Sequence, residues 1–205
     1  EGRGDSCREH NFKFMQKKVF MVHGWDGSPE NCWFPWLKTQ LEGRGFSVQV
    51  LSMPHPENPT IADWVGHIAG VVGEPNENMY FVGHSIGCQA ILRYVGGLDA
   101  PVGGIVCVAG FFRLLHLATE EEKAIAKPWL ETPMDYGAVQ SKAGAIIALF
   151  SDDDPDVALG DKELFEKYLG AKIVVEHGKG HFSDDDGVTK LPFALDAVLE
   201  IAGEK

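Results

Sequence analysis

Short runs of consecutive apolar residues alternate along the chain with longer segments in which apolar residues recur every three or four positions. The runs are rich in β-branched side chains and predict strands. Their nearly continuous hydrophobicity favours strands covered on both faces, as in a parallel sheet. The strands are expected at Val19–Val22, Ser47–Leu51, Met79–Val82, Gly104–Ala109, Ala145–Phe150 and Lys172–Val175.

The segments with helical periodicity lie between these runs. They are Phe34–Glu42, Ile61–Val72, Ile86–Val95, Lys162–Leu169 and Leu191–Ile201. Each can place an apolar face against a sheet. Regular alternation of strand and helix predicts a three-layer α/β fold, with a mostly parallel six-stranded sheet and helices on both faces.

A chain of 205 residues predicts a single domain over residues 1–205. Residues 1–17 form a polar lead-in, and residues 111–135 interrupt the alternation with a segment rich in Leu, Glu and Trp. We expect this segment to form a short helical lid. No apolar run approaches the roughly 18 residues that a membrane span needs.

The chain carries 18 basic and 30 acidic residues, a net charge of −12. This charge repels nucleic-acid backbones, anionic lipid surfaces and acidic substrates, and it tolerates cationic substrates better. The four cysteines match no zinc or redox spacing, and Cys88 and Cys107 lie in apolar runs. We therefore expect free thiols and a cytoplasmic protein.

The third predicted strand runs directly into Gly83-His84-Ser85-Ile86-Gly87 and then into a helix. In this strand–turn–helix context, G-x-S-x-G predicts a nucleophilic serine on a strained turn. Side chains at positions 83 and 87 would collide with the neighbouring strand and helix. Ser85 is therefore the candidate nucleophile, and it needs a base held by a carboxylate.

Four aspartates compete for the role of the acid after the fifth strand, in Ser151-Asp152-Asp153-Asp154-Pro155-Asp156-Val157. We select Asp154, because the apolar Val157 lets the loop turn back while the carboxylate points across the site, and Asp153 is the second candidate. The acids from Asp152 onward also have the spacing of a calcium loop. Val157 occupies the position where that loop needs glycine, and a strand precedes it in place of a helix.

The base is expected after the sixth strand, in Glu176-His177-Gly178-Lys179-Gly180-His181-Phe182. His181 lies deeper in this loop than His177, and its glycine neighbour lets the imidazole reach the sheet edge. The order Ser85, Asp154, His181 is that of α/β-hydrolases. Zinc bound by His177 and His181 is disfavoured, because the two intervening glycines argue against a shared helical face.

An oxyanion hole needs two backbone donors, which we assign to Ile86, directly after the nucleophile, and to Trp25, in the glycine-rich bend after the first strand. The indole of Trp25 could instead only line the pocket. Further aromatic residues are expected at the rim and would favour apolar or aromatic acyl groups. They are Trp33, Trp36, Phe111, Phe112 and Trp129, although core packing is an equal alternative for Trp33 and Trp36.

The chain resembles the small single-domain serine hydrolases of the retinoblastoma-binding type and their bacterial relatives. From about Val19 onward, the resemblance rests on His23-Gly24-Trp25, Trp33 and Trp36, Ser52-Met53-Pro54-His55-Pro56, Trp64, Gly83-His84-Ser85-Ile86-Gly87, Leu92-Arg93-Tyr94, Lys127-Pro128-Trp129, Asp153-Asp154-Pro155 and Gly180-His181-Phe182. It implies esterase, amidase or aminopeptidase activity on small acyl compounds, with Asp154 as acid and His181 as base. The L-x-C-x-E motif is absent, so binding to a pocket protein is not implied, and residues 111–132 are longer than the family's typical lid.

The sequence therefore predicts a serine hydrolase that cleaves small ester or amide substrates through an acyl-enzyme and requires no metal or organic cofactor. The alternative is a binding module that kept the fold without catalysis.

Overall fold

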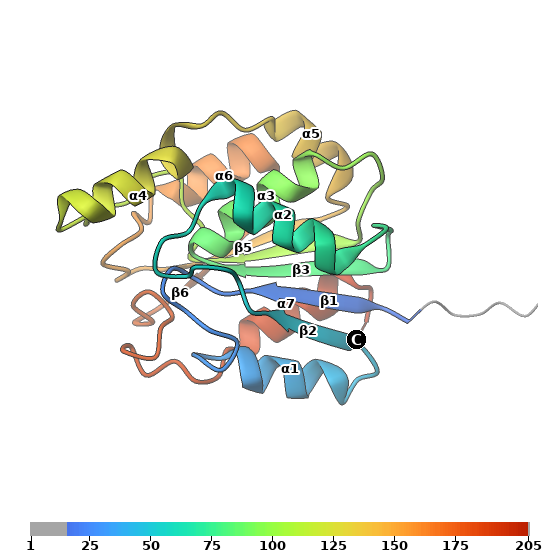
Figure 1. Cartoon of the computed structure of the whole chain (residues 1–205). Coiled ribbons are helices and arrows are strands. Elements are labelled where there is room, and N and C mark those ends of the chain that lie inside the picture. Colours follow the sequence, from blue (N-terminus) through green and yellow to red (C-terminus); the bar gives the residue numbers. More distant parts are fainter. Residues whose placement is uncertain (1–15, 205) are drawn as a thin grey trace, which may run out of the picture.

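The computed structural model describes residues 16–204 and contains one six-stranded sheet with helices on both faces (Figure 1). Apart from Gln16 and Lys17, the polar lead-in predicted over residues 1–17 lies outside the described residues.

The sheet has the strand order β2-β1-β3-β4-β5-β6, and every neighbouring pair is parallel. The sequence predicted each strand to within two residues at either end. The observed strands are β1 Lys18–Val22, β2 Ser47–Leu51, β3 Met79–His84, β4 Gly104–Val108, β5 Ile146–Ser151 and β6 Lys172–Glu176. All residues of β3, β4 and β5 are buried, as continuous hydrophobicity predicted.

Five helices match the predicted segments: α1 Phe34–Glu42, α2 Ile61–Val72, α3 Ile86–Gly96, α6 Asp161–Leu169 and α7 Pro192–Ile201. The 111–135 segment contains α4, Glu120–Glu131, and the unpredicted helix α5, Tyr136–Lys142, follows it. Within the described range, no helix is long and apolar enough to cross a membrane.

Each face of the sheet has its own apolar core. Helices α1 and α7 cover one face, and α2, α3, α5 and α6 cover the other (Figure 1). Of the large aromatic side chains, Trp33 lies in the core under α1 and α7, whereas Trp64 and Trp129 belong to the opposite core.

The chain order reverses at the pair β1 and β3. After β1 the chain moves outward to β2, then crosses back to β3 and continues in the other direction. The loops that leave β1 and β3 therefore diverge and open a crevice at the carboxyl ends of the strands. Val22 pairs with Gly83, so the loop after β1 lies beside the turn that carries Ser85.

Candidate active site

Ser85 lies at the sharp turn between β3 and α3. Its backbone angles are φ 52° and ψ −121°, a conformation that costs a residue with a side chain about 1–3 kcal/mol. A Cβ atom on Gly83 would lie 2.7 Å from the nitrogen of Cys88, and one on Gly87 would lie 2.6 Å from the carbonyl oxygen of His23. Both positions therefore require glycine for the predicted steric reason.

Ser85 lines a cavity of about 960 Å³ at the carboxyl edge of the sheet. The backbone N–H of Ser85 donates to the carbonyl oxygen of Val108 at 2.9 Å, which ties the turn to β4. Among the described residues, the hydroxyl has no hydrogen-bond partner. His181 lines the same cavity, and its ring centroid lies 5.0 Å from that of His84, the residue before Ser85.

The imidazole of His181 is paired with the carboxylate of Asp154. Its Nδ1 lies 3.0 Å and 3.1 Å from the two carboxylate oxygens. A carboxylate only accepts hydrogen bonds, so Nδ1 carries the proton and Nε2 is left to accept one. Asp154 has a side chain only 2% exposed, and its Oδ1 also accepts the backbone N–H groups of Asp156 and Val157. These contacts fix the carboxylate in place.

Nearby carboxylates favour the protonated form of His181. Burial, the largest single effect, lowers its pKa. The hydrogen bond and charge of Asp154, together with the charges of Asp156 and Asp186, outweigh burial and hold the pKa above its ordinary value of 6.5. The site therefore stabilises the imidazolium that would form if His181 accepted a proton.

The competing residues of the two late loops have other partners. Asp152 accepts a hydrogen bond from His177 at 2.6 Å, and the His177 side chain is 86% exposed and does not line the cavity. Asp153 accepts the backbone N–H of Gly180 at 2.9 Å. Of these acids, Asp154 is therefore the one whose carboxylate bonds to the ring of His181.

The loop after β6 is shaped to present His181. The backbone N–H of His181 donates to Oδ2 of Asp186 at 2.9 Å. The hydroxyl of Ser183 donates to the same carboxylate oxygen at 2.6 Å. Gly180 has φ 53°, where glycine is favoured, and the fully buried Phe182 anchors the loop in the core.

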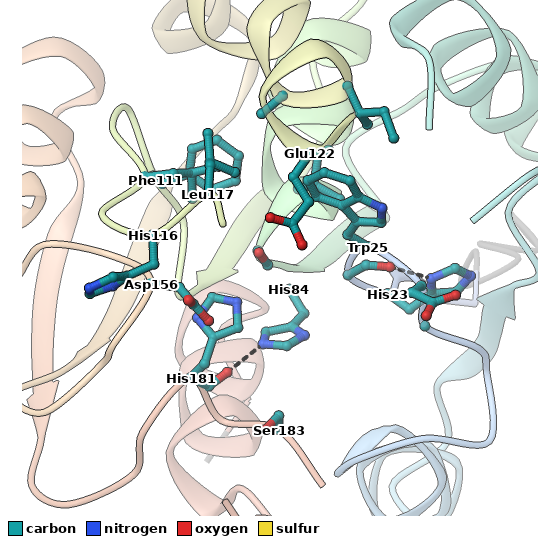
Figure 2. Close-up of a pocket in the computed structure, with 18 of the residues that line it drawn as sticks. His23, Trp25, His84, Phe111, His116, Leu117, Glu122, Asp156, His181 and Ser183 are labelled. Carbon is teal, nitrogen blue, oxygen red and sulfur yellow. Dashed lines mark hydrogen bonds between the residues drawn. The ribbon is translucent and has the colours of Figure 1, made fainter. Parts of the chain in front are cut away.

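Two further histidines lie buried beside the cavity. His84 donates from Nε2 to the carbonyl oxygen of His181 at 2.7 Å (Figure 2), and burial lowers its pKa to about 3. His23 donates from Nδ1 to the carbonyl oxygen of Gly24 and accepts the N–H of Met53, and burial lowers its pKa also. Both rings are therefore neutral and structural at physiological pH. Sequence reasoning missed His84 because it precedes the acid in the chain order.

Trp25 and Ile86, the predicted backbone donors of the oxyanion hole, both belong to the cavity lining. Neither backbone N–H has a hydrogen-bond partner among the described residues. Ile86 is the first residue of α3, where the helix dipole favours negative charge. The indole of Trp25 also lines the cavity while it donates to the carbonyl oxygen of Glu57 at 3.1 Å.

The predicted aromatic rim is only partly correct. Trp25, Phe111 and Trp129 line the cavity. Trp33, the residue before α1, is fully buried, and the partly buried Trp36 packs against the same core, so neither lines the cavity. Phe112 instead packs on Phe165 and Tyr136, at centroid distances of 4.9 Å and 5.6 Å.

The described residues offer one group that could hold a metal ion: Asp154, Asp156 and His181, with ligand atoms within 4.8 Å of one another. In this group Nδ1 of His181 is already bonded to Asp154. Asp154 and Asp156 belong to the calcium spacing considered above, whereas Asp152, the first acid of that spacing, is outside this group and bonds to His177.

Residues 111–135 form one wall of the cavity (Figure 2). The start of this segment is fixed by Asp161, which is fully buried and accepts the backbone N–H groups of Phe112 and Arg113 and the guanidinium of Arg113. The N–H of Leu115 donates to the carbonyl oxygen of Asp156 at 2.8 Å. The cavity wall is thus tied to the loop that carries Asp154.

The sheet order, the helices on both faces and the serine at the turn after β3 define an α/β-hydrolase fold. The chain belongs to the serine hydrolase family, whose family model matches residues 19–200.

Individual relatives agree with this assignment. YdeN of Bacillus subtilis (strain 168), named as a hydrolase, is 34% identical over 187 residues, which cover 90% of this chain and 95% of YdeN. The crystal structure of the ydeN gene product superposes with a TM-score of 0.84 at 30% identity and covers 92% of this chain and 100% of its own. Est1E from Butyrivibrio proteoclasticus, at 16% identity, shares the fold with a TM-score of 0.70 over 92% of this chain and 89% of its own.

Proposed function

We propose that this serine hydrolase cleaves small ester or amide substrates by two-step acyl transfer to water. Ser85 attacks the acyl carbon, and His181 accepts the hydroxyl proton at Nε2 and returns it to the leaving group. Water then attacks the acyl-enzyme. His181 accepts the proton of the water at Nε2 and returns it to the Ser85 oxygen, which releases the acid and restores Ser85. Asp154 orients the ring, and the backbone N–H groups of Trp25 and Ile86 stabilise the oxyanion.

The observation that carries this proposal is the pair formed by His181 and Asp154 at the wall of the cavity that Ser85 also lines. The free hydroxyl of Ser85 does not weigh against it, because bonds between nucleophile and base are often long before substrate binds. The free thiols of Cys32, Cys88 and Cys107 support a cytoplasmic location. We also propose that the chain is related to the serine hydrolases of the retinoblastoma-binding type. Esterase or aminopeptidase activity would follow from that relation.

The substrate group that we favour is apolar or aromatic. Trp25, Phe111 and Trp129 contribute aromatic surface to the cavity, and Leu114 and Ile125 add aliphatic surface. Such walls bind apolar acyl groups by removing their surface from water. Residues 111–135 would act as the lid over this group.

Hydrolysis of nitrophenyl esters of graded chain length, beside amino-acyl anilides, tests the proposal and separates esterase from aminopeptidase activity. We expect turnover by the wild type and by Ser52→Ala, an exposed serine after β2, and a loss of at least about a thousandfold in Ser85→Ala. Equal rates for wild type and Ser85→Ala would contradict the assignment of the nucleophile. No turnover of any substrate would favour the non-catalytic binding module.

A further inference from the structure

The cavity that contains Ser85 has a strongly one-sided charge. Seven of the described residues that line it are Asp or Glu, and none is Lys or Arg. Most of these acids are exposed at the rim, but Glu122 and Asp156 are half-buried. Their charges are consequently less screened by solvent than those at the rim.

Glu122 projects from α4 into the cavity. Trp25, Phe111 and Leu117 line the same cavity (Figure 2). The Glu122 side chain is held by a reciprocal N-terminal cap: its Oε2 accepts the N–H of Thr119 at 2.9 Å, and the Thr119 hydroxyl accepts the N–H of Glu122 at 3.1 Å. The cap therefore fixes where the charge sits.

The cap does not account for the charge itself. Glutamine forms the same reciprocal cap as glutamate, and Glu120 and Glu121 already place negative charge at this helix end. The cap uses one carboxylate oxygen, and Glu122 has no ion-pair partner among the described residues. A carboxylate without an ion-pair partner, in a cavity that aromatic side chains also line, is suited to a cationic ligand.

Asp156 has a different neighbourhood from Glu122. It lies in the group with Asp154 and His181, and its charge acts on the His181 ring. Glu122 is therefore the half-buried carboxylate left to interact with a bound substrate.

From these features we propose that the cavity selects acyl substrates that carry a positively charged group, and that the Glu122 carboxylate recognises this group. The inference rests on the proposed function, because it names the substrate class of the same site. The aromatic neighbours strengthen the selection, since Trp and Phe rings attract cations through their faces. Anionic substrates are excluded by the same carboxylates.

The test compares two nitrophenyl esters of the same shape. One is the ester of trimethylammoniobutanoate, and the other is its neutral isostere, in which a carbon atom replaces the nitrogen. We expect wild type to have a kcat/KM roughly tenfold higher for the cationic ester. A nitrophenyl hemisuccinate, which carries a carboxylate, should be the poorest substrate.

Glu122→Gln removes the charge and keeps the cap. It should lower kcat/KM for the cationic ester roughly tenfold and leave the neutral ester within about twofold. The control is Glu131→Gln, at the other end of α4, which loses the same charge away from the cavity and should leave both substrates unchanged.

Two outcomes overturn the inference while the proposed function stands: turnover of both esters with no preference for the cation, or equal losses for both esters in Glu122→Gln. If wild type turns over neither ester, or if wild type and Ser85→Ala turn them over at equal rates, the proposed function fails and the inference fails with it.

Discussion

The Nε2–H group of His84 donates to the backbone carbonyl oxygen of His181 at 2.7 Å, so the residue before the candidate nucleophile holds the loop of the candidate base. His84 is 5% exposed, and burial together with the neighbouring His181 lowers its pKa to about 3. Its ring stays neutral down to that pH, and a neutral ring that donates from Nε2 can hold the loop across the whole range in which His181 titrates.

Replacement of His84 should impair the placement of His181 more than the binding of substrate. We expect His84→Leu to lower kcat about tenfold to a hundredfold with little change in KM, because a misplaced base slows the chemical step. His84→Gln can still donate from its amide nitrogen and should recover part of this loss. Steady-state kinetics of an ester substrate measure both variants, and equal losses in the two would argue against the role of the donor.

The two leading acids should respond differently to the same substitution. Asp154→Asn removes the carboxylate that fixes the His181 tautomer, and we expect kcat to fall about ten thousandfold. Asp153→Asn changes a side chain that bonds to the backbone of Gly180 and should cost less than about tenfold. If Asp153→Asn is instead the inactive variant, the acid has been assigned wrongly.

The pH dependence of kcat/KM should report the carboxylates around His181. The base must be neutral to accept a proton, and its pKa in the free enzyme is raised. Activity should therefore rise with pH and reach half of its maximum above pH 6.5.

Asp156→Asn removes one negative charge that favours the imidazolium, so it should lower the His181 pKa. The rise of kcat/KM with pH, the acidic limb of the profile, should then move to lower pH. The control is Asp152→Asn, in the same loop but paired with His177, which should leave the limb in place. If the acidic limb of the profile moves in Asp152→Asn and stays in place in Asp156→Asn, this account of the charges around His181 is wrong.

The strands and most helices could be predicted because their patterns reflect burial directly. The residues of β3 read as a continuous apolar run, and all of them are buried. The helix α5 escaped prediction because it is only seven residues long and contains Gly137. It depends on tertiary packing, in which Val139 lies so close to Gly96 of α3 that a Cβ there would be 3.1 Å from it.

Chain order and glycine spacing were sufficient to select Ser85, Asp154 and His181 as candidates, because each follows the end of a strand. They were not sufficient to separate core aromatics from cavity aromatics, since Trp33 and Trp129 are both apolar and only the packing of α1 and α4 distinguishes them. Thr119-x-x-Glu122 carries a recognisable capping signal, from which the start of α4 could have been found.

The turn around Ser85 should tolerate no added methyl group. Gly87→Ala would bring a Cβ to 2.6 Å from the carbonyl oxygen of His23, and we expect it to lower the free energy of unfolding by about 3 kcal/mol. Gly66→Ala, in α2 with nothing within 4 Å of the new atom, should raise it by about 0.5–1 kcal/mol. Urea unfolding curves give both values, and a stable Gly87→Ala would show that the packing is looser than described.

Ser85 as the nucleophile is tested most directly by covalent labelling with a fluorophosphonate, followed by mass spectrometry of the peptides. The account predicts one adduct, located on Ser85, which is lost in Ser85→Ala. The adduct should be retained in Ser183→Ala, which replaces the second serine that lines the cavity among the described residues. An adduct on Ser183, or equal labelling of wild type and Ser85→Ala, would contradict it.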